Sequence, residues 1–417
     1  MFIQPMTLFN KCKISSNKKD DQFVGIKYDG DISITFPLGF NIPNDDEEEL
    51  RKDIYLLIKS ISMGNSIEKE SVNTSDVSNN NNTLPIYSYL WLSKEYVTNG
   101  LYKDKEFEKI INASGKINWK KTIQKTVPVI SNNSFVYLNN YYEKSKNIDT
   151  LITEIEKYCL KQVDVYFSWL LGNLKLNNSI FNDKDIPKMK SIVKKELSHT
   201  FKDSKKILLS HLLNILNGLD DDMINNKIYS YGTCQYQNVW EKMILDVYGN
   251  TNNLSSFYPS ANWNIRYGNV SDTVNLKPLR QDAIRYDKNT GNYYILDAKY
   301  YSAGSDPDMK GLPSTSDIEK QITYGMQLIN NKDKYRNVVD EKVYNALLIP
   351  YCSNKNDFGL SNPVEFVGIA NTSWLDNDLP YKKIQLIFVD TNYLFTCWKN
   401  RNKNDIEKLT NVISRSV

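Results

Sequence analysis

Asp297 and Lys299 stand at the end of the apolar segment "YYILDAKYY", and a second aspartate, Asp282, lies in the preceding segment "LRQDAIRY". Side chains two positions apart on a strand point the same way, so Asp297 and Lys299 are expected to lie together while Ala298 points to the other face. Carboxylates can bind a divalent cation, and an ammonium beside them can offset charge on a phosphoryl oxygen. The spacing therefore predicts metal-assisted hydrolysis of a phosphodiester.

The polar turn at 287–292 predicts that these two segments form a hairpin. A centre between Asn289 and Thr290 places Asp282 opposite Asp297, with Cβ atoms about 5 Å apart, where like charges destabilise the pair. A cation between them would relieve this repulsion, and Mg²⁺ is usually held by one or two carboxylates plus water or phosphate. The alternative is a surface ion cluster on an ordinary hairpin. A strand this apolar is expected to be buried, where unpaired charges are costly.

Two helices are expected to flank these strands. The first, in "QYQNVWEKMILDVYGN", ends at Gly249 and carries Glu241 beside its apolar face, where the ordinary alternative is a solvated glutamate. The second, in "STSDIEKQITYGMQLIN", begins with Ser316 and Glu319 in capping-box spacing. Further strands are expected in "VYNALLIPY", "PVEFVGIA" and "KIQLIFVD". Together these patterns predict a mixed α/β domain over 231–417.

The remaining chain is expected to form two other parts. A hairpin in "FVGIKYDGDISITFPLGFNI" and a helix in "DDEEELRKDIYLLIKSIS" predict a small α+β, β-rich N-terminal domain over 1–70. A polar stretch at 71–84 predicts a flexible linker, and helical spacing predicts a mostly helical middle domain over 85–230. The many lysines of this middle region are interpreted as a solvated helix face, with contact to nucleic-acid phosphates as the alternative.

The composition sets further bounds. The chain has 417 residues, of which 41% are hydrophobic and 24% charged, as in soluble proteins of two or three domains. The net charge of +3 does not by itself argue for a polyanion partner. With only two histidines, imidazole clusters are nearly excluded, so hydrolysis must rest on carboxylates, lysine and a hard metal. No apolar run is long enough for a bilayer and no signal peptide is evident, so a cytoplasmic protein without membrane contact is expected.

The order of these motifs resembles the PD-(D/E)xK nucleases. "GKINWKKTI", "NVWEKM", "ILDAKYY" and "DIEKQITYG" resemble the LlaJI-type restriction endonucleases in particular, which are relatives of the McrC nuclease subunit. The resemblance implies an α/β fold with a C-terminal PD-(D/E)xK core, in which a mixed sheet is flanked by helices. The small β-rich N-terminal domain and the mostly helical middle region would precede this core.

The resemblance also implies roles for individual residues. Asp282 and Asp297 would hold Mg²⁺, Lys299 would be the catalytic lysine and Glu241 an auxiliary acid that also binds the metal. Gln321 would line the site, with Lys320 and Tyr324 nearby. One departure from the family pattern concerns the proline expected directly before the first aspartate. Gln281 occupies that position and Pro278 lies further upstream, which leaves the register of the first acidic strand open.

The function implied is that of a Mg²⁺-dependent endonuclease subunit of a GTP-driven restriction system acting on duplex DNA. The sequence contains no G-x-x-x-x-G-K-[ST] loop, so a separate McrB-like AAA+ GTPase subunit is expected in a hetero-oligomeric complex. The N-terminal and middle regions would dock on that subunit. Two alternatives remain open: a catalytically inactive adaptor that binds DNA and stimulates the partner GTPase, and a RecB-like repair exonuclease.

Overall fold

The structure is a computed structural model that describes residues 8–43, 45–71, 85–112, 115–131, 134–174, 176, 178–219, 229–251, 253–268, 270–335, 338–375 and 378–416. Most of the predicted linker, 72–84, lies outside these residues. By contacts the chain divides into two compact units. Unit 1 comprises 1–81 together with 227–417, and unit 2 comprises 82–226. The segment predicted as an N-terminal domain thus shares a compact unit with the segment that carries Asp282 and Asp297.

The N-terminal segment of unit 1 forms a four-stranded sheet with one strand from much later in the chain. The predicted hairpin is confirmed, because Ile26 lies opposite Ile34 in an antiparallel pair around the turn at Gly30. A long helix follows, and its first turn carries three glutamates, which favour the positive end of the helix dipole. The elements are β1 (Cys12–Ile14), β2 (Val24–Tyr28), β3 (Ile32–Phe36), β9 (Tyr229–Thr233) and α1 (Glu47–Ser71), with sheet order β1-β3-β2-β9.

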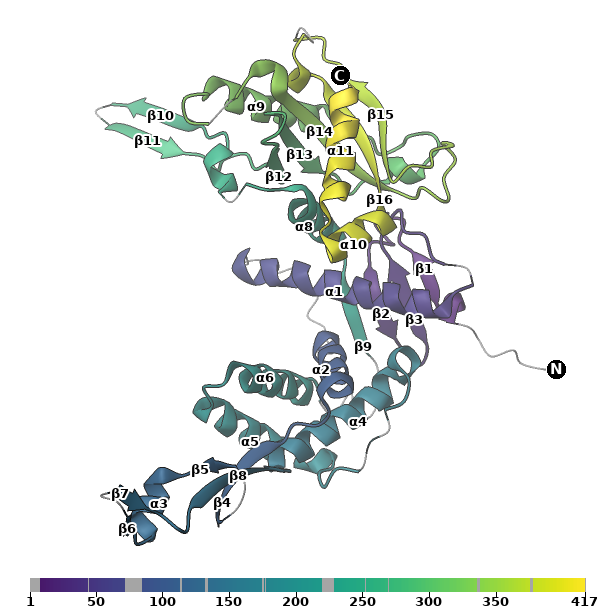
Figure 1. Ribbon diagram of the computed structural model, residues 1–417. Helices are drawn as coiled ribbons and strands as arrows, with labels where there is room; N and C mark the ends of the chain where they lie inside the picture. The colour runs from purple at the N-terminus through teal and green to yellow at the C-terminus, as the bar shows by residue number, and fades with distance from the viewer. Residues whose placement is uncertain are drawn as a thin grey trace, which may run out of the picture. The chain divides into compact units, whose positions relative to one another are not determined.

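The second sheet of unit 1 is mixed, as predicted, and helices flank it (Figure 1). Its strand order is β12-β13-β14-β16-β15, with parallel pairs in the middle and an antiparallel pair at each edge. The strands are β12 (Ala283–Tyr286), β13 (Tyr293–Ala298), β14 (Val343–Tyr351), β15 (Val364–Ala370) and β16 (Ile384–Asp390). The helices are α8 (Tyr236–Tyr248), α9 (Thr315–Asn330), α10 (Thr391–Asn400) and α11 (Lys403–Arg415).

The apolar residues of β13 explain its burial: five of its six residues are apolar, all six are buried, and successive side chains serve opposite faces of the sheet. On one face, Ile295 belongs to the same core cluster as Tyr324 and Leu328 of α9. On the other face, the hydroxyls of Tyr294 and Ser414 of α11 lie 2.7 Å apart. Asp297 is in phase with Ile295 and therefore belongs to the α9 face.

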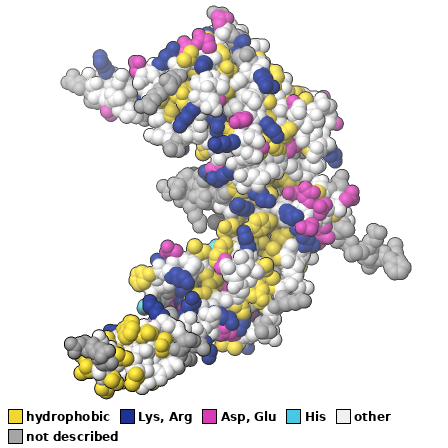
Figure 2. Space-filling model, in the orientation of Figure 1, with side chains coloured by type: hydrophobic (Ala, Val, Ile, Leu, Met, Phe, Trp, Pro, Cys, Tyr) yellow, Lys and Arg dark blue, Asp and Glu magenta, His cyan; other side chains and the backbone are white. Residues whose placement is uncertain are grey.

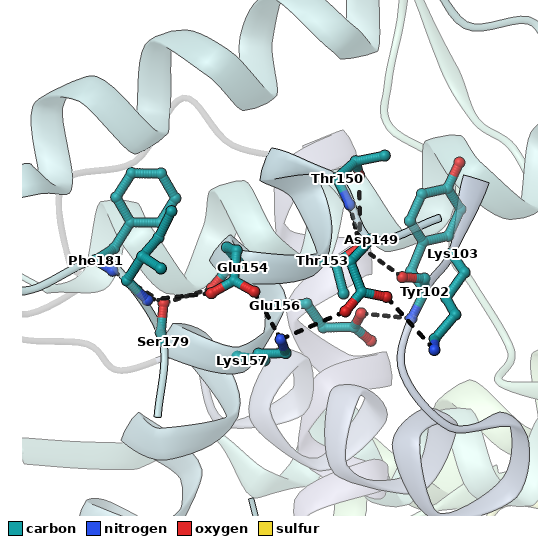
Figure 3. A network of polar contacts seen from close by, with 11 residues as sticks. Tyr102, Lys103, Asp149, Thr150, Thr153, Glu154, Glu156, Lys157, Ser179 and Phe181 are labelled. Atoms are coloured by element: carbon teal, nitrogen blue, oxygen red, sulfur yellow. Dashed lines mark hydrogen bonds and ion pairs between the residues drawn. The ribbon is translucent and has the colours of Figure 1, made fainter. Parts of the chain in front are cut away.

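The described residues of unit 2 form four longer helices, one short helix and two small sheets. The chain is fixed at the start of β4 by the polar network in Figure 3, in which Thr153 donates to the Tyr102 carbonyl (2.7 Å) and the Tyr102 N–H donates to Glu156 (2.7 Å). Burial raises the pKa of Glu156 to about 7. The helices are α2 (Ile86–Asn99), α3 (Trp119–Lys125), α4 (Leu151–Leu171), α5 (Ile186–His199) and α6 (Asp203–Gly218). The strands are β4 (Asp104–Ile111), β5 (Lys116–Ile117), β6 (Val129–Ser131), β7 (Ser134–Val136) and β8 (Tyr141–Ile148).

Apolar side chains are exposed around α3, β6 and β7, where Figure 2 shows hydrophobic atoms gathered at one end of unit 2. We call this surface the apolar lobe; its members are Trp119, Ile123, Val127, Ile130, Phe135 and Leu138. Contiguous exposed apolar surface of this kind marks interaction sites more often than chance. Within the described ranges, no helix combines the length and the low polarity that crossing a bilayer requires.

Candidate active site

The hairpin of β12 and β13 brings Asp282 opposite Asp297. Ala283 pairs with Leu296 and Tyr286 with Tyr293, so the next pair outward is Asp282 with Asp297. This register confirms the predicted centre of the hairpin. The Ala298 N–H donates to Oδ2 of Asp282 at 2.7 Å, which ties the two segments together at the point where both carboxylates stand.

Lys299 lies beside Asp297, as the two-residue spacing predicted. Its Nζ is 2.6 Å from Oδ2 of Asp297 and 3.2 Å from Oδ1 of Asp317. The Lys299 N–H donates to the Leu348 carbonyl at 2.9 Å, so the pairing of β13 with β14 continues one residue past the end of the strand. This bond fixes the backbone of Lys299, and the two carboxylates fix its ammonium.

Asp317 reaches Lys299 because it lies in the first turn of α9. The predicted capping box at Ser316 and Glu319 is wrong, since the N-cap is Ser314 and its partner is Asp317. The Ser314 N–H donates to Oδ2 of Asp317 at 2.9 Å, leaving Oδ1 for the ammonium. Asp317 is the site residue that the sequence reasoning missed. Ser314 and Asp317 also have capping-box spacing, S-x-x-D, and this pattern overlaps the one predicted at Ser316 and Glu319.

The carboxylates repel one another in a poorly solvated place. Burial raises the pKa of Asp282 well above its ordinary range, and the charges of Asp297 and Glu241 raise it further. Burial also raises the pKa of Asp297, although Lys299 opposes this effect. For Lys299, burial lowers the pKa, but the carboxylates of Asp297 and Asp317 outweigh burial and raise it. The ammonium is therefore firmly protonated at neutral pH.

Glu241 lies near the aspartates without a direct partner among the described residues. Burial raises its pKa first, and the charge of Asp297 adds to this effect. Its helix is fixed where β13 ends beside β14. The indole N–H of Trp240 donates to the carbonyl of Leu348 in β14 at 3.3 Å, and the rings of Trp240 and Tyr300 lie 6.3 Å apart. The predicted auxiliary acid is thus within electrostatic range of Asp297.

The predicted residues of α9 differ in what they contact. The amide of Gln321 is fully buried and donates to the Ala346 carbonyl at 3.5 Å, while its Oε1 has no hydrogen-bond partner among the described residues. Lys320 is exposed, and its charge lowers the pKa of Asp297. The hydroxyl of Tyr324 donates to the Arg280 carbonyl at 2.8 Å, next to the strand that follows Asp282.

Gln281 occupies the position where a proline was expected. Its side chain is buried and donates to the Phe257 carbonyl at 3.3 Å. This contact links the segment before Asp282 to the chain that follows α8. The observed pairing of Ala283 with Leu296 removes the doubt about register that the missing proline raised.

Asp282 and Asp297 are the candidate ligands for a metal ion at this site. No group of three or more His, Cys, Asp or Glu side chains in the described ranges is arranged to hold an ion. Asp282 and Asp297 nevertheless offer two adjacent carboxylates whose repulsion a cation would relieve. Two carboxylates completed by water or phosphate are what Mg²⁺ usually takes from a protein. The two aspartates therefore fit such an ion, and Glu241 is close enough for its charge to raise the pKa of Asp282.

The sequence is similar to known restriction enzymes. The family model described as LlaJI restriction endonuclease matches residues 23–392. The type II restriction enzyme BsuMI component YdjA of Bacillus subtilis (strain 168) is 26% identical over 337 residues, which span 76% of this chain and 67% of that protein. The refined half-complex of Thermococcus gammatolerans McrB AAA+ hexamers with bound McrC aligns at 13% identity with a TM-score of 0.37, covering 94% of this chain and 83% of that chain. A TM-score this low carries no argument about the fold.

Proposed function

This chain belongs to the LlaJI restriction endonuclease family, and from that premise we propose that it is the nuclease subunit of a restriction system and hydrolyses phosphodiester bonds of duplex DNA with Mg²⁺. The observation that carries the proposal is the convergence of Asp282, Asp297 and Lys299. The two aspartates are opposite each other in the hairpin register, and the ammonium is 2.6 Å from Asp297.

We assign the PD-(D/E)xK core to α8, β12, β13, α9 and β14. In this assignment the hairpin supplies both aspartates and the lysine, α8 supplies Glu241, and α9 supplies Gln321. The parallel pairing of β13 with β14, with α9 as the connection, supports the assignment. The cytoplasm is the expected location.

Asp282 and Asp297 would hold the Mg²⁺ ion, with Glu241 as an auxiliary acid. When bound, the cation supplies Lewis-acid chemistry and lowers the pKa of an attacking water. The carboxylates themselves orient this site: Asp282 is fixed by the Ala298 N–H, and Asp297 is fixed by Lys299. Each aspartate makes its contact through Oδ2.

Lys299 would stabilise negative charge on the phosphoryl oxygens. Because Asp297 and Asp317 raise its pKa, it stays protonated and acts as a hydrogen-bond donor and cation rather than as a base. Fixed donors aimed at developing charge contribute strongly to catalysis in a poorly solvated site. Asp317 would position this ammonium, since it is tied to the start of α9 by Ser314.

The system would also contain an AAA+ GTPase subunit. The relative in Bacillus subtilis is described as a component of a restriction enzyme, which supports a multi-subunit arrangement. The sequence contains no P-loop motif, so nucleotide hydrolysis would come from another chain. The apolar lobe of unit 2 is the surface best suited to dock on it, because an exposed apolar surface is stabilised by a protein partner.

The function is tested with supercoiled plasmid, the full chain and the proposed AAA+ GTPase subunit. Wild type is expected to open the circle in Mg²⁺ and GTP, but not in EDTA. Lys299→Ala should reduce cleavage by at least about 100-fold while GTP hydrolysis by the complex stays unchanged. If neither protein cleaves DNA and Lys299→Ala loses the GTP hydrolysis of the complex, the chain is instead an adaptor. Cleavage of linear but not circular DNA would identify an exonuclease.

A further inference from the structure

A two-stranded ribbon extends from unit 1 (Figure 1). In the sequence it lies a few residues before Asp282. It consists of β10 (Asn262–Tyr267) and β11 (Val270–Asn275), paired with each other and with no other described strand. Every residue of β10 is exposed, including Trp263 and Tyr267, which are 64% and 66% exposed. Two-stranded ribbons are marginally stable alone in water, so a binding partner is expected for at least one face.

The two faces of the ribbon differ sharply in chemistry. Trp263 pairs with Val274, and Ile265 with Asp272, so the face that they share with Tyr267 is mostly apolar and carries the ribbon's one acidic residue. The other face bears only hydrogen-bonding side chains and one cation. Its members are Asn262, Asn264, Arg266, Ser271, Thr273 and Asn275.

The polar face has the residue types that read DNA. Arginine can donate two hydrogen bonds to guanine, asparagine can bond adenine by both donor and acceptor, and Ser and Thr can bond either. The major groove, about 12 Å wide, admits a two-stranded ribbon. Asn264 is already aligned by the Thr273 hydroxyl, which donates to its Oδ1 at 3.0 Å. A protein partner would be expected to favour the apolar face instead.

The base of the ribbon is fixed to the candidate active site. Two backbone bonds extend the pairing, from Leu276 to Ala261 and from Leu279 to Pro259, both at 2.9 Å. Leu279 is three residues before Asp282, a distance of about 10 Å at most along an extended chain. A duplex held on the ribbon is thereby held by a segment that leads directly into Asp282.

Side chains from the nuclease core anchor both legs of the ribbon. Tyr335 donates to the Ser256 carbonyl at 2.7 Å, and its ring stacks on Phe257 with centroids 4.4 Å apart. Tyr324 of α9 holds the carbonyl of Arg280 on the second leg. Gln281 then joins the two legs through the Phe257 carbonyl. The ribbon is thus coupled to the element that carries Asp317.

We propose that the polar face of the β10–β11 ribbon enters a groove of duplex DNA and that Asn264 and Arg266 contact the base edges or phosphates there. This inference rests on the proposed function, because it assigns the substrate-holding element of the same site. In this role the ribbon holds the DNA and does not position the catalytic residues.

The test measures binding of a labelled 30-bp duplex to the full chain in EDTA. The double variant Asn264→Ala/Arg266→Ala should weaken binding by at least about tenfold and reduce the slope of log Kd against log salt by about one. The matched control Trp263→Ser/Tyr267→Ser changes the opposite face of the same strand and should bind within about twofold of wild type.

The outcomes separate this inference from the proposed function. If the polar-face variant binds like wild type, or if the apolar-face variant alone loses binding, the ribbon assignment is overturned. Asp297→Asn, assayed in parallel with the GTPase subunit and Mg²⁺, should bind the duplex and fail to cut it. Cutting by Asp297→Asn would refute the proposed function, whatever the ribbon variants do. If wild type binds no duplex, the ribbon assignment is overturned, and the cleavage assay alone decides the proposed function.

Discussion

The ammonium of Lys299 lies 3.2 Å from the carboxylate of Asp317, which belongs to a different element and is also hydrogen-bonded to the N-cap of α9. The start of the helix and the position of the proposed catalytic lysine are therefore linked through one side chain. Hydrogen bonds from Ser314 and the charge of Lys299 outweigh burial and lower the pKa of Asp317. Asp317 is accordingly ionised at neutral pH and holds Lys299 in the charged state.

Replacing Asp317 by Asn should reduce cleavage by about tenfold, because the ammonium of Lys299 keeps only Asp297 as a partner and is held less firmly in place. The loss should be the same at every pH between 6 and 10, since Asp297 still raises the pKa of Lys299 and the ammonium stays protonated. The measurement is the single-turnover rate over this pH range. Ser314→Ala is the control: it removes the cap at a cost of about 1 kcal/mol but keeps the charge at 317. A rate for Asp317→Asn equal to that of Ser314→Ala would refute the positioning role.

Replacing Asp282 by Asn should stabilise the metal-free protein at alkaline pH. The pKa of Asp282 is raised in the folded state. The stability that its protonated carboxyl contributes is therefore fully present below the ordinary carboxyl range and is lost as pH rises through the folded-state pKa. Asn keeps an acceptor for the Ala298 N–H and carries no charge.

Urea unfolding in EDTA measures this effect of Asp282→Asn. The variant should gain on the order of 1 kcal/mol over wild type at pH 8, because it removes one of two like charges that lie opposite each other, and little at pH 4. Added Mg²⁺ should stabilise wild type more than the variant. The same pH dependence in both proteins would contradict the assignment of repelling carboxylates.

The segments that follow β1 and β3 should support the chain just after β13, where Lys299 and Tyr300 lie. The hydroxyl of Tyr300 accepts the buried Leu38 N–H at 2.7 Å, and the Tyr300 carbonyl accepts from Asn17 at 2.8 Å. Tyr300→Phe leaves the Leu38 donor unpaired and should cost about 1–3 kcal/mol in urea unfolding. The exposed Tyr267→Phe serves as a control and should be neutral. Equal stability of the two variants would show that the hydroxyl contributes nothing.

The hairpin register could be predicted from the sequence because it depends on a local feature. The turn at 287–292 fixes which residues are equidistant from its centre, and the pairing follows. The shared face of Asp297 and Lys299 follows from strand geometry alone. Both predictions needed no knowledge of distant residues, and the mixed sheet followed from the order of strand-like and helical segments.

The contacts of Asp317 and of the N-terminal sheet could not be predicted in this way. Two overlapping S-x-x-acid patterns compete at the start of α9, and local propensity does not choose between them. The pairing of β2 with β9 joins residues about 200 positions apart in the sequence, which no local pattern encodes. How close Glu241 lies to Asp297 likewise depends on how α8 packs against Tyr300.

The apolar lobe should bind the GTPase subunit. Ile130 and Phe135 pair across β6 and β7 and are 73% and 70% exposed. Changing both to Ser should weaken binding of the GTPase subunit by at least about tenfold, with little change in unfolding free energy because the side chains are exposed. Phe201→Ser, which alters a 90% exposed ring elsewhere in unit 2, is the control. Binding that is lost only in the control would place the interface elsewhere.

The most direct test of the catalytic assignment is the single-turnover rate of duplex cleavage by Asp297→Asn in the full complex with Mg²⁺. Asp297 pairs with Lys299 and opposes Asp282, so its charge is central to the proposed site. Asp308→Asn, which removes an exposed carboxylate paired with Lys310, controls for net charge. We predict a loss of at least about 100-fold in Asp297→Asn and none in Asp308→Asn. Cleavage by Asp297→Asn at the rate of the control would contradict the assignment.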